Sequence, residues 1–206
     1  LERLLCETAA SAGYRPLVKK SSHSGTMVNL LYQRGVQQGK VMVVLDYLNL
    51  SPLLPPRSVV ADVVGGPQVR FTTNHPYELF GGKVKALLGR VAARDLFDIN
   101  SISTVAQGDQ SPLLSRILTY SQATSLSFPR PVVIADRFAS RQHLVDQHLI
   151  PMLPVGSEVT LDKMISGAES FFDSYFAGMS DAEKQFIDLA RRGEYRPEIL
   201  FSDEPS

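Results

Sequence analysis

The chain has 206 residues, of which 44% are hydrophobic and 20% are charged, and 21 Lys and Arg residues balance 21 Asp and Glu residues. This composition is typical of a globular protein with a sizeable core and excludes an intrinsically disordered chain. No run of about 18 uncharged apolar residues exists, which excludes an integral membrane protein. The single cysteine, Cys6, excludes an intrachain disulfide and a multi-cysteine metal site, so the sequence favours a cytoplasmic protein.

The net charge of zero conceals an asymmetry along the chain. Residues 1–141 contain 16 Lys and Arg against 9 Asp and Glu, whereas residues 142–206 contain 5 against 12. A basic body is compatible with an anionic ligand such as a nucleotide or RNA, and equally with a solvated surface followed by an acidic helical tail. Charge alone leaves both interpretations open.

The first 74 residues predict one helix followed by strands. The apolar residues Leu1, Leu4, Leu5 and Ala9 have helical spacing, and Gly13 suits the end of that helix. Three extended segments follow, at residues 15–20, 26–33 and 40–48, joined by hairpin connections. Residues 49–68, rich in Pro and Gly, predict a crossing loop, and residues 69–73 predict an edge strand.

Asp46 follows the apolar run from Val41 to Leu45, which predicts a strand that is buried on both faces. A buried carboxylate at the end of such a strand needs a cation or a metal ion as its partner. The alternative is that Asp46 emerges into water at the strand end.

From Pro76 onward the apolar period changes from two to 3.6. Pro76 suits the first turn of a helix capped by Asn74 or His75. The predicted helices span residues 77–88, 94–107, 112–124, 139–149, 161–176 and 181–192. Ser180 and Glu183 have the spacing of a capping box, which predicts where the last helix begins.

Charges crowd residues 78–98. On one continuous helix, Lys83, Arg90 and Arg94 would line a single face that could hold a triphosphate. The alternative is structural, with Arg94 and Asp98 as an i, i+4 ion pair and an extended, solvated Lys83. The segment is not a phosphate-binding P-loop, since Tyr77 and Val84 stand where Gly and Ser or Thr are needed.

This segment also carries a family resemblance. The runs Glu78-Leu-Phe-Gly-Gly-Lys83, Ala86-Leu-Leu-Gly-Arg90 and Arg94-Asp95-Leu-Phe-Asp98 resemble the signature of the AbiEii/AbiGii-type nucleotidyltransferase toxins, relatives of the DNA polymerase β-like superfamily. Residues 181–201 resemble the C-terminus of that family, and the strand ending at Asp46 resembles its third-carboxylate strand.

The resemblance implies a role for each matching residue. Asp46 would be a catalytic metal ligand, Lys83 would contact the nucleotide phosphates, and Asp95 would be the essential acidic residue. Arg90, Arg94 and Asp98 would complete the nucleotide-binding segment. The resemblance also implies Mg²⁺, a nucleoside triphosphate donor, an RNA acceptor such as tRNA, and a cognate antitoxin in a bacterial toxin–antitoxin system.

One departure from the family pattern concerns its N-terminal motifs. The family has a Gly-Gly or Gly-Ser turn followed by Asp-x-Asp, and no Asp-x-Asp occurs in these 206 residues. One of three metal carboxylates does not suffice for two-metal chemistry. We therefore expect an N-terminally truncated form that is inactive alone, or a non-catalytic relative.

The resulting prediction is an α+β protein. Residues 1–74 would form the remainder of a nucleotidyltransferase α/β domain with an antiparallel or mixed sheet, and residues 75–206 a mainly helical domain. The predicted function is transfer of a nucleotide from a nucleoside triphosphate to RNA. The alternatives are a non-catalytic nucleotide- or RNA-binding protein of the same fold, and a helical interaction domain.

Overall fold

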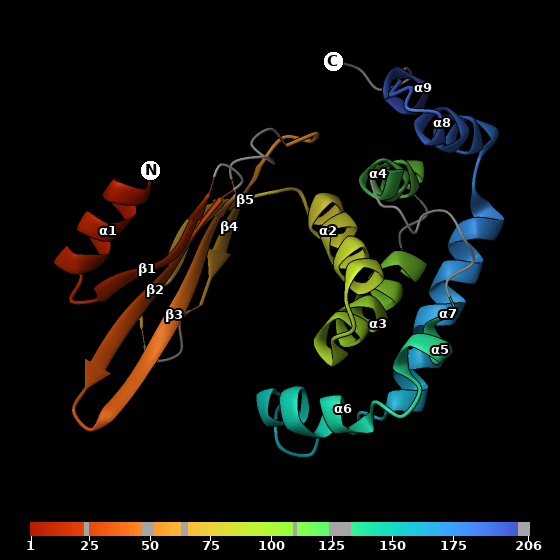
Figure 1. The fold of residues 1–206 in the computed structure, drawn as a ribbon. Coiled ribbons are helices and arrows are strands. Elements are labelled where there is room, and N and C mark those ends of the chain that lie inside the picture. Colours follow the sequence, from red (N-terminus) through yellow and green to blue (C-terminus); the bar gives the residue numbers. More distant parts are fainter. Residues whose placement is uncertain (23–24, 47–51, 63–65, 109–110, 124–132, 202–206) are drawn as a thin grey trace. The chain divides into compact units, whose positions relative to one another are not determined.

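The computed structural model describes residues 1–22, 25–46, 52–62, 66–108, 111–123 and 133–201. The chain divides into two compact units, Leu1–Leu53 and Leu54–Ser206 (Figure 1). The first unit combines a helix with antiparallel strands, and the second combines a strand hairpin with helices. The predicted α+β class is confirmed. Among the described residues, no helix is both long and apolar enough to cross a membrane.

The first unit is one helix and a three-stranded antiparallel sheet. Its elements are α1 (Glu2–Ser11), β1 (Arg15–Ser22), β2 (Gly25–Arg34) and β3 (Gln37–Asp46). The strand order is β1-β2-β3, so β2 is the central strand. Gly35 has a φ of +59° in the two-residue turn between β2 and β3, a conformation that glycine adopts without steric cost.

A small core lies between α1 and one face of this sheet. Ala9, Val28 and Leu30 are buried, and Val43 packs against them. The prediction that β3 is buried on both faces is wrong, because Val43 packs against this core while Met42 and Val44, which point to the opposite face, are 58% and 57% exposed. The predicted apolar face of the first helix is confirmed in part, since Leu5 and Ala9 pack in this core, whereas Leu1 and Leu4 are exposed.

The second unit opens with a strand hairpin. β4 (Arg57–Ala61) and β5 (Val69–Thr73) pair antiparallel, with Val59 opposite Phe71. The edge strand at residues 69–73 is confirmed, whereas the loop predicted for residues 49–68 contains β4. The Pro and Gly residues on either side of β4 led to the prediction of a loop. The Val-Val pair of this short strand favours an extended backbone.

His75 links this hairpin to the first long helix, α2 (Pro76–Gly89). The imidazole Nδ1 accepts a hydrogen bond from the Tyr77 amide at 3.3 Å, which caps the helix as predicted. The Arg57 guanidinium lies 2.9 Å from the other ring nitrogen. Burial lowers the pKa of His75, and the positive charge of Arg57 lowers it further.

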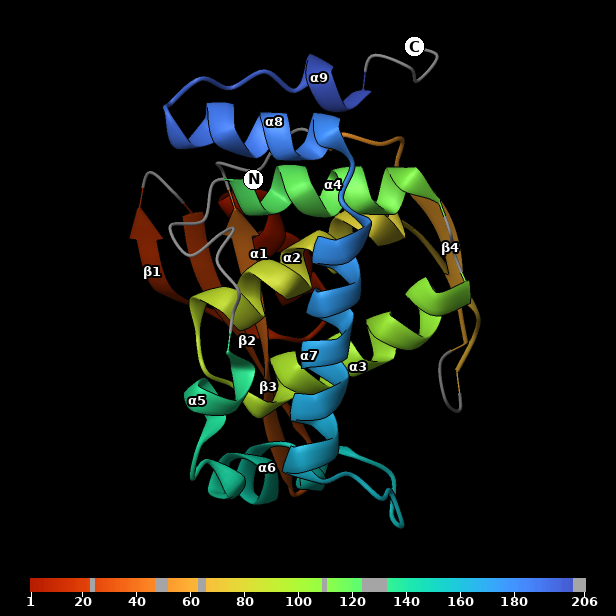
Figure 2. The ribbon, with the colours of Figure 1, turned by 90° about the vertical axis from the view of Figure 1, so that its right-hand side faces the viewer.

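Helices make up the rest of the second unit. They are α3 (Ala93–Gly108), α4 (Pro112–Ala123), α5 (Ile134–Phe138), α6 (Gln142–His148), the 3₁₀ turn η1 (Ile150–Met152), α7 (Leu161–Gly178), α8 (Asp181–Arg191) and α9 (Glu198–Phe201). The helix predicted for residues 139–149 begins late, because Ser140 has a φ of +58° and separates α5 from α6. Figure 2 shows α7 crossing α3, and α4 lying beside α8.

The crossing of α3 and α7 depends on a close approach at Gly167. The Asn100 side-chain amide of α3 donates to the carbonyls of Leu96 (2.9 Å) and Met164 (2.8 Å), which bridges the two helices. A Cβ atom at Gly167 would collide with the Asn100 side chain. Around this crossing lie the predicted core residues of α7, including the buried Phe172.

A buried carboxylate joins α4, α7 and α8. Glu183, 3% exposed, accepts hydrogen bonds from the Ser180 amide and hydroxyl, which confirms the predicted capping box. Its other oxygen accepts from Ser115 and Thr119 of α4, and the Thr119 hydroxyl is 2.5 Å from that of Tyr175 on α7. Burial raises the pKa of Tyr175, so its phenol stays protonated.

We expect Gly167→Ala to lower the free energy of unfolding by about 1–3 kcal/mol, because the added methyl group displaces Asn100 from its bridge. Gly178→Ala in the same helix is the matched control, since its Cβ meets no atom within 4 Å. Urea unfolding of the full chain measures both. Equal effects of the two substitutions would contradict the close approach.

We expect His75 to make the protein more stable above pH 6.5 than below it. Its pKa is lowered in the folded state, so the unfolded chain binds more protons, and stability is lost as the pH falls below the ordinary histidine value of about 6.5. His75→Asn keeps a capping group but does not titrate. Between pH 7.5 and pH 5.5, the melting temperature should fall less in this variant than in the wild type. An equal fall in both proteins would rule out the contribution of His75.

Candidate functional site

The charged segment at residues 83–98 spans two helices. α2 ends at Gly89, Arg90 is extended with φ −145° and ψ 168°, and α3 begins at Ala93. The prediction that three cations line one continuous helical face is therefore wrong. Lys83 lies on α2 and Arg94 on α3, so the chain turns a corner between them. The break itself agrees with the separate helices predicted for residues 77–88 and 94–107.

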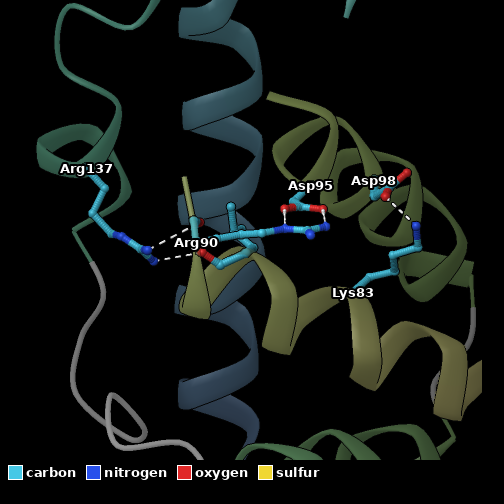
Figure 3. Close-up of polar contacts among 6 residues, drawn as sticks. Lys83, Arg90, Asp95, Asp98 and Arg137 are labelled. Carbon is cyan, nitrogen blue, oxygen red and sulfur yellow. Dashed lines mark hydrogen bonds and ion pairs between the residues drawn. The ribbon is translucent and has the colours of Figure 1, made fainter. Parts of the chain in front are cut away.

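Arg90 and Asp95 form a bidentate ion pair across this corner (Figure 3). Arg90 Nε lies 2.6 Å from one carboxylate oxygen of Asp95, and Nη2 lies 2.8 Å from the other. Asp95 is 1% exposed, whereas the side chain of Arg90 is 52% exposed. The hydrogen bonds to Asp95 raise the pKa of Arg90. A half-exposed guanidinium is thus held in a defined orientation by a buried carboxylate.

Arg137 of α5 holds the same corner from another side. Its guanidinium donates to the carbonyl of Leu87 at 2.8 Å and to that of Arg90 at 3.3 Å (Figure 3). The last carbonyls of a helix have no partner within the helix, and a cation is favourable at that end. The sequence interpretation missed Arg137, because α5 was not predicted and residue 137 is 47 positions away from Arg90.

Lys83 and Asp98 form a second pair between α2 and α3. Their charged atoms are 2.8 Å apart, and the side chains are 51% and 31% exposed (Figure 3). Asp95 and Asp98 lie about one turn apart on α3, and each pairs with a cation that comes before α3 in the sequence. The sequence alternative paired Asp98 with Arg94; in the structure Asp98 contacts Lys83 and Arg94 is exposed.

The Gly81-Gly82 pair before Lys83 serves helix packing. Gly81 is buried against α4, where its carbonyl accepts a hydrogen bond from the Gln122 amide at 3.0 Å. A Cβ at Gly81 would collide with Ser121, whereas a Cβ at Gly82 would meet nothing within 4 Å. Both glycines lie inside α2, which agrees with the prediction that this run is not a phosphate-binding loop.

The predicted metal ligand, Asp46, belongs to the first unit. Its backbone ends β3 opposite Gly25, and its side chain lies outside the described part of the structure. Within the described residues, no three His, Cys, Asp or Glu side chains gather closely enough to hold a metal ion. Asp95 and Asp98 are already engaged by Arg90 and Lys83. These residues therefore do not fit a metal site on their own.

Comparisons with known proteins agree with the resemblance of residues 78–98. Residues 4–177 match the family described as the nucleotidyl transferase AbiEii toxin of a type IV toxin–antitoxin system, and the chain belongs to this family. Membership implies a nucleoside triphosphate as substrate and a cognate antitoxin. A comparison with curated protein sequences finds no match.

The fold is similar to that of a solved structure, MenT4, a nucleotidyltransferase toxin from Mycobacterium tuberculosis H37Rv. The TM-score is 0.67 at 14% sequence identity, and the match covers 100% of this chain and 75% of that one.

We expect Arg90→Ala to destabilise the protein more than Asp95→Asn. The arginine substitution leaves a buried carboxylate without its partner, at a cost of about 3 kcal/mol, whereas the asparagine variant leaves a half-exposed guanidinium, at about 1–2 kcal/mol. Lys83→Ala is the control, because the more exposed Lys83–Asp98 pair contributes less than about 1 kcal/mol. Urea unfolding measures all three variants. Similar losses for Arg90→Ala and Lys83→Ala would contradict the buried pair.

Proposed function

We propose that the protein transfers a nucleotide from a nucleoside triphosphate to RNA, with the α2–α3 corner as its nucleotide-binding part. An acceptor hydroxyl oxygen attacks the α-phosphorus and forms a new P–O bond. The bond between the α-phosphorus and its bridging oxygen to the β-phosphorus breaks, pyrophosphate leaves, and the hydroxyl proton passes to solvent. The charge that grows on the leaving pyrophosphate calls for cations that are already in position.

One observation carries the proposal: in a chain of nucleotidyltransferase family, Lys83 and Arg90 are half-exposed cations that α3 carboxylates hold in place. Lys83 has an ammonium group that a triphosphate oxygen could attract away from Asp98. Arg90 uses Nε and one Nη2 proton on Asp95, so its remaining N–H groups are available to a phosphate. We assign both side chains to phosphate contacts.

Asp95 then acts through Arg90. Its carboxylate is buried and both of its oxygens accept hydrogen bonds from the guanidinium, so a role in orienting Arg90 fits its surroundings better than direct contact with substrate. Asp98 has the corresponding relation to Lys83. Substitution of either carboxylate would misplace a phosphate-binding cation.

The Mg²⁺ requirement and the role of Asp46 as its ligand are proposed from the family resemblance alone. When bound, the ion would polarise phosphate oxygens. RNA as the acceptor is supported by the excess of Lys and Arg over residues 1–141, since a basic surface attracts a polyanion without regard to sequence.

The test is label transfer from each radiolabelled nucleoside triphosphate to total RNA, with Mg²⁺ and the full-length gene product. Lys83→Ala should lower the transfer rate about 100-fold, the usual effect of removing one group that stabilises transition-state charge. Lys163→Ala, an exposed lysine of α7, is the matched control and should leave the rate unchanged.

Two outcomes would overturn the proposal. If folded wild-type protein transfers no label from any of the four triphosphates, it is not an RNA nucleotidyltransferase. Retained binding of triphosphate or RNA in that case would indicate the non-catalytic alternative. Equal activity of Lys83→Ala and Lys163→Ala would remove the α2–α3 corner from the reaction.

A further inference from the structure

A pocket of about 460 Å³ lies beside the α2–α3 corner, within the second unit. The connection between α2 and α3 and the first turn of α3 form one wall, and α6 with η1 forms the other. Its lining residues are Val91, Ala92, Ala93, Arg94, Leu144, His148 and Met152.

The lining combines apolar walls with two nitrogen-bearing side chains. Val91 and Met152 are 36% and 63% exposed, so apolar surface is open to solvent here. Arg94 and His148 are exposed as well, and no described side chain pairs with the Arg94 guanidinium. Because this cation lacks a carboxylate partner among the described residues, its positive charge is available to an anion. An apolar pocket beside a guanidinium that no described carboxylate engages is complementary to a ligand that joins a ring with apolar faces to a phosphate.

Arg94 belongs to a different side of α3 from the two carboxylates. Asp95 and Asp98 turn toward Arg90 and Lys83, whereas Arg94 lines the pocket shared with α6. Lys83 precedes the end of α2 by about two turns, a rise of roughly 10 Å. On α3, Asp98, the partner of Lys83, follows Arg94 by about one turn, so the lysine assigned to the donor triphosphate and the pocket belong to the same corner.

We propose that this pocket holds one nucleotide of the acceptor RNA, with its base against the apolar walls and its phosphate on Arg94 and His148. The inference rests on the proposed function and adds a specific subsite to it. It separates Arg94 from the donor-binding cations: Lys83 and Arg90 would serve the triphosphate and Arg94 the acceptor strand.

Binding of a fluorescein-labelled single-stranded RNA heptamer, followed by anisotropy without any nucleoside triphosphate, tests the pocket. Arg94→Ala should weaken binding about tenfold and lower the slope of log K against log salt by about 0.7, as expected for one lost phosphate contact. Ala92→Leu should occupy part of the pocket and weaken binding at least fivefold without changing the salt slope, because it adds bulk and no charge. Met152→Ala, at an exposed side chain, tests the same wall with little effect on folding.

Arg70→Ala, on β5, is the control for loss of one exposed positive charge. If Arg94→Ala and Arg70→Ala weaken RNA binding equally, the effect is general surface charge and the pocket is not a subsite. The same conclusion follows if neither Ala92→Leu nor Met152→Ala changes affinity. If Arg94→Ala weakens binding of α,β-methylene ATP as strongly as that of RNA, the pocket belongs to the donor and the inference is overturned.

These binding measurements do not depend on nucleotide transfer, so they separate the proposed RNA subsite from the proposed transferase activity. Arg94-dependent RNA binding by a protein that transfers no label would leave the pocket intact and refute the proposed function. Label transfer by Arg94→Ala with an unchanged KM for RNA would support the proposed function and refute the pocket as an RNA subsite.

Discussion

The bidentate ion pair between Arg90 and Asp95 is the contact on which the α2–α3 corner depends. A carboxylate that is 1% exposed has a large desolvation cost, and two short hydrogen bonds from one guanidinium offset it only if the corner keeps its geometry. Arg137 binds the carbonyls of the same turn. These two sets of hydrogen bonds fix the backbone of residues 87–95, so the side chains of this segment have defined orientations.

This geometry suits the phosphate binding that a nucleotidyltransferase requires. Phosphate-binding cations act best when they are oriented before the substrate arrives, since no reorganisation is then needed during the reaction. Lys83 and Arg90, which we propose as phosphate-binding residues, meet this condition because Asp98 and Asp95 hold them. Arg94 lines a separate pocket, so the α2–α3 corner has two chemically different surfaces. One carries paired cations, and the other is apolar with a cation that has no carboxylate partner within the described residues.

Much of the fold could be predicted from local patterns. The cap at His75, the capping box at Ser180 and Glu183, and the longer helices of the second unit are set by short-range hydrogen bonds and apolar spacing. The mistakes have non-local causes. An apolar run predicted that β3 is buried on both faces, but only one of its faces packs against the small core of the first unit. The short strand β4 is defined by its pairing with β5.

The sequence by itself determined the α+β class, the family, and the set of charged residues between Lys83 and Asp98. It could not determine which charge pairs with which. The i, i+4 rule suggested Arg94 with Asp98, because it considers one helix at a time. The tertiary structure packs α2 against α3, so Asp98 pairs with Lys83 and Asp95 with Arg90, while Arg94 lines a pocket formed with α6. Pairing across a helix break depends on packing between elements, which spacing along the chain does not encode.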